Sequence, residues 1–357
     1  MSAGAVAVTP PVPVHPDRTW SQIQGLDLRH LLHLSDDVGL LEHARGAVAR
    51  LEHGYCVDDA ARAAILLCRE PNPSAYVASL AGRYTVFVIR AQGPDGGFRN
   101  RLAHNGEWQD EPGTGDWWGR ALWGLGTAAA HGPDWIRASA LSGFVRGAGI
   151  RPIHVRSMVF AALGAVQVLN AYPAHRAARE LLAAAVVAIG PDGPDRAWPW
   201  PQKRLHYANA AIPEVLIGAG HLLHDKALTE RGLRLLGWLL EAESVAGHFS
   251  PAPVGGRSPG DPRPAFDQQP IEIAALADAC ASALAITGDP RWAHGIQLAA
   301  AWFDGDNDLR APMRDPATGG GYDGLTPNGP NRNQGAESTL ALLSTFQQHR
   351  RLQMEDT

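Results

Sequence analysis

The chain has 357 residues, of which 45% are hydrophobic and 19% are charged, and its formal net charge is −5. This composition supplies a hydrophobic core and excludes a disordered chain. The acidic balance disfavours a nucleic-acid-binding protein, because such a protein needs basic side chains to neutralise phosphates. The 39 glycines and 27 prolines exceed average usage, so turns and loops make up an unusually large part of the chain.

The N-terminal segment 1–25 is predicted to be a flexible arm ahead of the folded domain. Prolines at positions 10, 11 and 13 interrupt its apolar residues, and no basic residue precedes His15, which is unlike a secretory signal peptide. No apolar run in the chain reaches the about 18 residues of a membrane-spanning helix. We therefore expect a cytoplasmic protein without a membrane span.

The three cysteines are Cys56, Cys68 and Cys280. They form no C-x-x-C pair and are odd in number, so neither a disulfide framework nor a structural zinc site is expected. We predict no metal site and no cofactor.

From residue 57 onward, the sequence predicts helices in consecutive pairs. Apolar residues recur at intervals of three and four, which is the spacing of one face of an α-helix. The turn within a pair is short; in one case it is the single residue Asp225. The predicted pairs are 60–70 with 74–90, 117–130 with 134–146, 154–170 with 174–189, 207–224 with 226–243, and 270–287 with 290–304. A last helix at 335–351 needs a partner, which the segment 26–44 can supply.

The connections between the pairs are long and rich in glycine and proline. They span 92–115, 190–204, 245–266 and 305–332, and each precedes the first helix of a pair. Long loops in a compact domain are usually functional. If six pairs close into a ring with the first helices inside, these loops meet at one end. We predict an all-α fold, a single-domain (α/α)6 toroid over 26–350 with a tail at 351–357; an open α-superhelix is the alternative.

Polar residues cluster where each predicted inner helix begins. Capping of the helix N-terminus is the simplest interpretation of Asp58, Asp116, Asp267 and Asn333. A carboxylate in a first turn also suits the helix dipole. These two effects leave several further polar side chains without a full explanation, namely Asp59, Gln269, Glu272, Gln334 and Glu337.

Aromatic residues accompany the polar clusters in the same loops. They are Trp108, Trp117, Trp118, Trp198, Trp200 and Tyr322. Sugar rings stack on aromatic faces while carboxylates and amides bind the hydroxyl groups, so six such clusters on one rim resemble a cleft for polyols. Hydrophobic packing of the loops is the alternative explanation for the tryptophans.

Five segments resemble a bacterial family of all-helical toroid proteins. They read GYCVDDAARA at 54–63, DWWGRALWGLG at 116–126, WPWPQKRLHYANAAIPEVL at 198–216, FDQQPIEIAALADA at 266–279, and GYDGLTPNGPNRNQGAEST at 321–339. Members of that family are often encoded beside, or fused to, retaining-type glycosyltransferases. The resemblance covers roughly residues 25–347. It implies a fold similar to six-hairpin glycosidases and sugar 2-epimerases and a role in carbohydrate metabolism.

The chain also departs from the pattern of that family. Gln202 and Ala208 stand where family members tend to have acidic residues, and Trp117 and Trp118 replace a Ser-His pair. These departures remove two carboxylates and a histidine from the predicted rim, which weakens the case for catalysis.

The leading functional prediction is a glycosidase-type enzyme that acts on an oligosaccharide or polysaccharide. Such chemistry needs two carboxylates, about 5–5.5 Å apart for retention or about 6.5–9.5 Å apart for inversion. The catalytic candidates are Asp58 or Asp59 together with Glu272 or Glu337. The predicted saccharide-binding residues are Asp116, Trp117, Trp118, Arg120, His154, Arg156, Trp200, Tyr207, Asn209, Asp267, Gln268, Gln269, Tyr322, Asn333 and Gln334.

Two other functions fit the sequence. The first is a sugar epimerase or isomerase, in which His154 or His206 at an inner helix start acts as the base. The second is a non-catalytic glycan-binding or scaffold domain that partners a glycosyltransferase, in keeping with the missing carboxylates. A saccharide ligand is common to all three interpretations.

Overall fold

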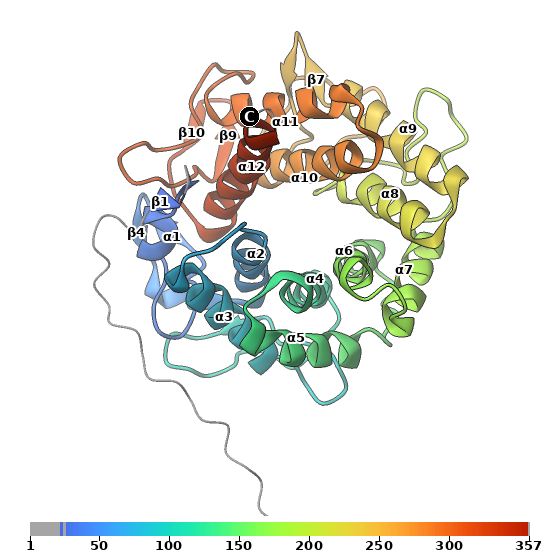
Figure 1. Ribbon diagram of the computed structural model, residues 1–357. Helices are drawn as coiled ribbons and strands as arrows, with labels where there is room; N and C mark the ends of the chain where they lie inside the picture. The colour runs from blue at the N-terminus through green and yellow to red at the C-terminus, as the bar shows by residue number, and fades with distance from the viewer. Residues whose placement is uncertain (1–21, 24–25, 356–357) are drawn as a thin grey trace, which may run out of the picture.

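Six helices of the computed structural model surround the centre of a ring, and further helices lie outside them (Figure 1). The structure describes residues 22–23 and 26–355. The inner helices are α2 (Val57–Cys68), α4 (Asp116–His131), α6 (Val155–Ala171), α8 (Ala211–Leu223), α10 (Pro270–Thr287) and α12 (Ala336–Glu355). Each contacts the next, and α12 contacts α2, so the inner ring is closed. The predicted (α/α)6 toroid is confirmed, and the open superhelix is excluded.

The outer helices follow their inner partners in the chain and pack against them. They are α3 (Ala75–Arg90), α5 (Asp134–Gly147), α7 (Arg176–Ile189), α9 (Lys226–Ala242) and α11 (Pro290–Phe303). Side-chain caps start several of them. His224 and Asp225 link α8 to α9, and Asp225 accepts a hydrogen bond from the backbone N–H of Leu228. The partner of α12 is the short helix α1 (Arg29–His33). The segment 26–44 therefore supplies this partner as predicted, but only five of its residues are α-helical.

The loops ahead of the inner helices contain short antiparallel ribbons rather than long strands. The paired strands are β1 (Gln22–Ile23) with β2 (Leu26–Asp27), β3 (Ala44–Arg45) with β4 (Val48–Ala49), β5 (Tyr55–Cys56) with β6 (Arg101–Leu102), β7 (Ser244–Val245) with β8 (His248–Phe249), and β9 (Gly324–Thr326) with β10 (Gly329–Asn331). A 3-10 turn covers Leu51–His53. Backbone bridges between Leu205 and Arg257 and between Gln268 and Leu325 join neighbouring loops. The loops thus form a connected rim at the N-terminal end of the inner ring.

Close backbone contact between α4 and α6 depends on glycine. A Cβ atom at Gly126 would lie 2.4 Å from the carbonyl oxygen of Gly164, and one at Gly119 would lie 2.3 Å from that of Ser157. Real side chains do not fit at such distances, so the two helices can pack this tightly because the glycines have no Cβ atom. Large buried side chains such as Trp292 and Trp302 fill the space between the two helical layers.

Helix α10 is long and apolar enough to cross a membrane by length and composition. It is also an inner helix of the ring, with 56% of the apolar window buried inside the protein. Core helices of water-soluble proteins satisfy the same criteria, so the helix does not establish a membrane span.

The predicted segment boundaries at the two ends fall partly outside the described residues. Of the arm 1–25, the structure describes Gln22–Ile23, which pair with β2. At the other end, α12 continues to Glu355, so much of the predicted tail 351–357 is helical. Helix α8 begins at Ala211 rather than at 207, because residues 207–210 form a turn that is held by other contacts.

Candidate active site

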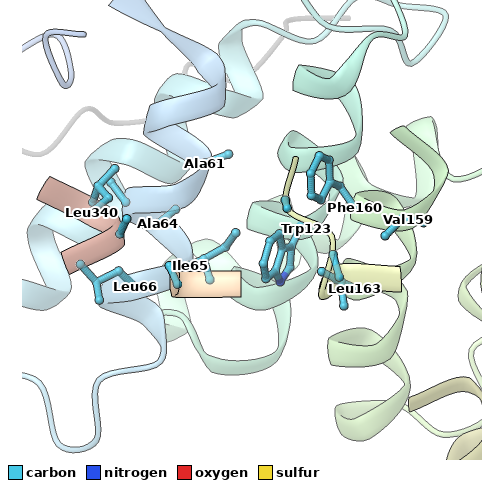
Figure 2. Close-up of a cluster of buried hydrophobic side chains, with 14 of the residues drawn as sticks. Ala61, Ala64, Ile65, Leu66, Trp123, Val159, Phe160, Leu163 and Leu340 are labelled. Carbon is cyan, nitrogen blue, oxygen red and sulfur yellow. The ribbon is translucent and has the colours of Figure 1, made fainter. Parts of the chain in front are cut away.

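The centre of the ring contains a narrow cavity at the end where the inner helices begin; we call it the upper lumen. Its wall is chiefly apolar and includes Ile65, Trp123, Phe160, Ile271 and Leu340. The Trp123 and Phe160 rings come from α4 and α6 and are nearly parallel, with centroids 6.3 Å apart, and Figure 2 shows the two side chains beside each other. The free volume is about 60 Å³. This is room for a few water molecules.

Arg62 is the centre of a charged cluster at the top of the upper lumen. Its Nη2 atom lies 2.9 Å from Asp58 Oδ2 and 2.7 Å from Glu337 Oε2, and its Nη1 atom lies 2.5 Å from Asp59 Oδ1. Asp58 and Asp59 precede Arg62 by four and three residues on α2, the spacing that places side chains on one helix face. Glu337 comes from the first turn of α12. The Arg62 cluster therefore joins the first and last inner helices.

Arg120 of α4 extends this cluster across the lumen. Its Nε atom lies 2.9 Å from Asp58 Oδ1, and its guanidinium lies over the Phe160 ring, 3.8 Å from the centroid. The residue is 3% exposed, and within the described part of the chain its Nη2 atom has no hydrogen-bond partner. The Nε atom of Arg62 lacks a partner in the same way. Buried donors are normally satisfied, so these two indicate a missing acceptor such as water or a ligand hydroxyl.

Burial has opposite consequences for the charges of Asp59 and Arg62. Desolvation raises the pKa of Asp59 from 3.8 to about 7, with Glu337 and Asp58 adding to the rise and Arg62 opposing it. Desolvation lowers the pKa of Arg62, but the carboxylates of Asp58, Glu337 and Asp59 outweigh it and raise that pKa. Asp59 is 2% exposed, whereas the Glu337 side chain is 40% exposed. Glu337 is therefore the carboxylate of this cluster that a ligand can reach most easily.

Asp59 also belongs to a second group of side chains, whose residue types can bind metal ions. Ligand atoms of Glu42, Cys56 and Asp59 lie within 4.8 Å of one another. The chain's own arginines already pair with both carboxylates, Arg101 with Glu42 and Arg62 with Asp59. Burial raises the pKa of the Cys56 thiol well above its usual value, which keeps it protonated. This group therefore does not fit a metal ion, because metal binding needs a free thiolate and free carboxylates.

Glu272 does not join the Arg62 cluster. Its Oε1 atom accepts a hydrogen bond from the Ala208 N–H at 2.5 Å, and its Oε2 atom accepts from the Asn209 N–H and Nδ2 at 3.3 and 3.2 Å. Burial raises the pKa of Glu272 to about 8, and Glu243 adds to the rise. Ala208 has a φ of 44°, a conformation that an L-residue adopts only when its surroundings enforce it. The structure thus gives Glu272 a positioning contact with the turn ahead of α8.

Arg156 supports the same turn from α6. It donates from Nη1 to the Ala208 carbonyl at 3.0 Å and lies over the Tyr207 ring at 5.5 Å. Tyr207 packs against Phe160, with the ring centroids 6.3 Å apart. The predicted residues Arg156, Tyr207 and Asn209 are therefore brought together beside the upper lumen. Of these three, Tyr207 alone is not buried.

The predicted helix caps are mostly wrong. The N-cap positions of α2, α4 and α10 are Cys56, Gly115 and Gln269, none with a side-chain cap. Asp58 instead binds arginines, Asp116 accepts from Ser157 Oγ at 2.9 Å, and Asn333 accepts from the Gly46 N–H at 2.9 Å. Asp267 is exposed. The start of α12 is held by Asp323, whose Oδ1 accepts from the Gly335 N–H at 2.8 Å.

Several predicted binding residues are tryptophans whose side chains contact other parts of the protein. Trp118 and Trp200 are 0% and 1% exposed, and Trp200 stacks on Trp238 at 5.9 Å. Trp117 donates from Nε1 to the Phe98 carbonyl at 2.7 Å. These contacts bear out the packing explanation for the three tryptophans.

The remaining predicted residues divide into buried amides and exposed rim groups. Gln268 donates to Asp308 Oδ2 at 2.5 Å, and Gln334 accepts from Thr318 Oγ1 at 2.7 Å, so both amides connect loops. His154 is exposed and stands at the N-cap position of α6 without a side-chain cap. Gln269 and Tyr322 are partly exposed in the rim loops.

Sequence reasoning missed Arg62, Trp123 and Phe160. Arg62 was detectable, because it follows Asp58 and Asp59 at helical spacing inside the segment 54–63. Trp123 follows Arg120 by three residues on the same helix. Phe160 lies in an apolar helix, and its sequence does not distinguish a residue that faces the lumen from one that packs in the core.

Comparisons with solved structures find the same ring in carbohydrate-active enzymes. A cellobiose 2-epimerase from Spirochaeta thermophila matches with a TM-score of 0.67 and 12% identity over 91% of this chain and 94% of that one. A sugar epimerase from a ruminal bacterium matches with a TM-score of 0.67 and 10% identity over 90% and 95%. A GH76 alpha-mannanase from Bacteroides thetaiotaomicron matches with a TM-score of 0.61 and 8% identity over 85% and 88%.

At these identities the similarity shows the shared fold alone. It confirms the expected similarity in fold to sugar epimerases and six-hairpin glycosidases. No protein-family model matches the chain, and no curated protein matches its sequence.

Proposed function

We propose that the protein is a carbohydrate-active enzyme of the glycosidase type that binds a saccharide over the Arg62 cluster. The observation that carries the proposal is the combination of an accessible carboxylate, Glu337, with buried arginine donors that have no acceptor among the described residues. Hydroxyl oxygens of a sugar supply such acceptors. Tyr207 and Tyr322 are partly exposed aromatic residues of the rim loops. The fold supports this proposal, since several solved proteins with the same ring are named for activities on sugars.

The spacing of the carboxylates favours a retaining mechanism. Asp58 and Glu337 bind the same Nη2 atom of Arg62 at 2.9 and 2.7 Å. Their oxygens therefore lie no more than about 5.6 Å apart, which is closer than the about 6.5–9.5 Å of an inverting pair and allows the about 5–5.5 Å or less of a retaining pair. In this mechanism Glu337 is the carboxyl in contact with the glycosidic bond, and Asp58 is the second carboxyl of the catalytic pair. The Arg62 side chain must move out of the gap when a sugar enters.

A non-catalytic glycan-binding role is the second candidate, and two observations favour it. Arg62 fills the space between the carboxylates, and the upper lumen has a free volume of only about 60 Å³. A sugar would then rest on the rim while the protein serves as a cytoplasmic partner of a glycosyltransferase. An epimerase finds less support, because His154 and His206 are exposed and the described lining of the upper lumen contains no histidine.

The test combines a binding screen with a turnover assay. Manno-, gluco- and arabino-oligosaccharides are titrated by calorimetry, and products are followed by NMR, which also reports the anomeric configuration. We expect binding and hydrolysis with retention for at least one series. Glu337→Gln should lower turnover by about 10²–10⁴-fold, the usual contribution of a general acid or base. Glu111→Gln is the matched control, since the Glu111 side chain is 92% exposed.

The outcomes separate the candidates. Binding that Glu337→Gln weakens, without turnover in the wild type, supports the glycan-binding role and overturns the enzyme. Conversion of a sugar to its epimer, without hydrolysis, supports the epimerase. If no saccharide binds, the proposed function is wrong in all its forms.

A further inference from the structure

The opposite end of the ring, where the inner helices end, has a larger cavity. Its volume is about 520 Å³, and we call it the lower cavity. Residues from the ends of α2, α4, α6, α10 and α12 line it, among them Arg69, His131, Gln167, Ser282 and Gln348. Sites for small molecules usually measure about 300–1,000 Å³. The lower cavity is thus large enough for a small ligand, whereas the upper lumen is not.

A polar network forms the floor of this cavity. Asp278 accepts hydrogen bonds from Arg69 Nη1 at 3.2 Å and from Gln348 Nε2 at 2.6 Å. Glu214 accepts at Oε1 from Ser282 Oγ at 3.0 Å. Glu214 and Asp278 are 6% and 7% exposed, and both also line the upper lumen. The two carboxyls therefore separate the two cavities.

Glu214 has hydrogen-bonding capacity that the protein does not use. Among the described residues no group donates to its Oε2 atom, although the side chain lies at the cavity. Burial raises the pKa of Glu214 to about 8, Asp278 adds to the rise, and Arg69 opposes it. At neutral pH the carboxyl therefore holds a proton and can donate as well as accept. A buried carboxyl is costly unless it is hydrogen-bonded, so a partner inside the cavity would offset this cost.

The chemistry of the lining defines the class of ligand. Arg69 pairs with Asp278 and Arg137 pairs with Asp134. Arg351 donates to the Arg69 carbonyl and to Gln348 Oε1, and among the described residues its charge has no carboxylate partner within ion-pair distance. His131 is the single aromatic ring among the lining residues, so a planar base would find little to stack on. Donors and acceptors lie side by side on the floor, and a molecule with several hydroxyl groups matches both.

We propose that the lower cavity is a second ligand site, which binds a hydroxyl-rich molecule of monosaccharide size through Glu214, Asp278 and Gln348. This proposal does not depend on the function of the Arg62 cluster, because no residue of that cluster lines the lower cavity. A ligand here reaches the protein from the end opposite to the long loops.

The test measures binding of three probes, D-mannose, D-glucose and myo-inositol, by calorimetry. Ala285 is exposed at the mouth of the cavity, so Ala285→Trp should block entry without disturbing the core. Gln348→Ala removes one hydrogen bond from the floor. We expect the wild type to bind at least one probe, Ala285→Trp to abolish that binding, and Gln348→Ala to weaken it by about tenfold, the value of one hydrogen bond of about 1.4 kcal/mol.

The controls assign each binding signal to one end of the ring. A signal that is lost in Glu337→Gln and kept in Ala285→Trp belongs to the rim, and it would overturn the lower site while leaving the proposed function intact. Absence of binding of all three probes to the wild type also overturns the lower site. Thermal unfolding confirms that each variant is folded; if Ala285→Trp is not, an unchanged affinity in Gln348→Ala refutes the proposal.

Discussion

Replacement of Asp59 by asparagine should change how stability depends on pH. Asp59 is buried at 2% exposure, and burial raises its pKa from 3.8 to about 7. Arg62 lies 2.5 Å from it, but the same guanidinium also binds Asp58 and Glu337. Because the attraction of Arg62 is shared among three carboxylates, the desolvation of Asp59 has the larger effect on its pKa.

The sign follows from proton uptake by the folded and unfolded states. Below pH 3.8 the Asp59 carboxyl is protonated in both states and adds no pH dependence. Between pH 3.8 and about 7 the unfolded chain releases the proton while the folded protein keeps it. Stability therefore falls as pH rises, by about 1.4 kcal/mol per pH unit, and the loss reaches about 4 kcal/mol above this range.

Urea unfolding of the wild type and Asp59→Asn from pH 4.5 to 8 measures this contribution. The difference between their free energies of unfolding removes the effects of all other titrating groups. We expect the wild type to lose stability relative to Asp59→Asn as the pH rises, with a plateau above about pH 7. Asp134→Asn is the control, because it makes the same change on a side chain that is 93% exposed. If the wild type instead gains stability relative to the variant as the pH rises, Arg62 keeps Asp59 ionised in the folded protein, and the reasoning is refuted.

Three further substitutions test the fold by the same urea measurement. Glu272→Ala leaves the N–H groups of Ala208 and Asn209 without their acceptor and should cost about 2–5 kcal/mol; a loss below 1 kcal/mol would refute the positioning contact. Gly126→Ala forces α4 and α6 apart and should cost about 1–3 kcal/mol, whereas Gly149→Ala, with open space around its Cβ, should be near neutral. Gly237→Ala fills no occupied space on α9 and should stabilise the protein by about 0.5–1 kcal/mol; destabilisation would contradict this.

Sequence patterns predicted the ring because its helices are regular and its turns are short. The periodicity at 270–287 coincides with α10, and the predicted helix 117–130 differs from α4 by one residue at each end. The turn 207–210 was mistaken for helix because its residues have suitable propensities, whereas its conformation depends on Glu272 and Arg156 from other helices. A local sequence pattern carries no information about contacts between residues that lie more than fifty positions apart in the chain.

The candidate site was predictable only in part, for a similar reason. Residue type and position at a helix start identified Asp58, Asp59 and Glu337, and the structure brings them together on Arg62. The same rule also selected Glu272, whose partners are backbone N–H groups rather than other charges. A carboxylate in a first turn can face the lumen or the neighbouring loop, and only the packing of the ring decides which.

Both candidate ligand sites lie next to the contact between α2 and α12, where the first and last inner helices close the ring; we call this contact the seam. At the upper end Arg62 of α2 binds Glu337 of α12, and toward the lower end Gln347 of α12 donates to the Leu66 carbonyl of α2 at 3.0 Å. The α4–α6 contact, by comparison, relies on glycines and tight backbone packing. Buried ion pairs add little to stability compared with apolar side chains of similar size, so ring closure alone does not require charges at the seam. The ligand binding that we propose at the upper end accounts for the charges of Arg62 and Glu337, which closure does not require.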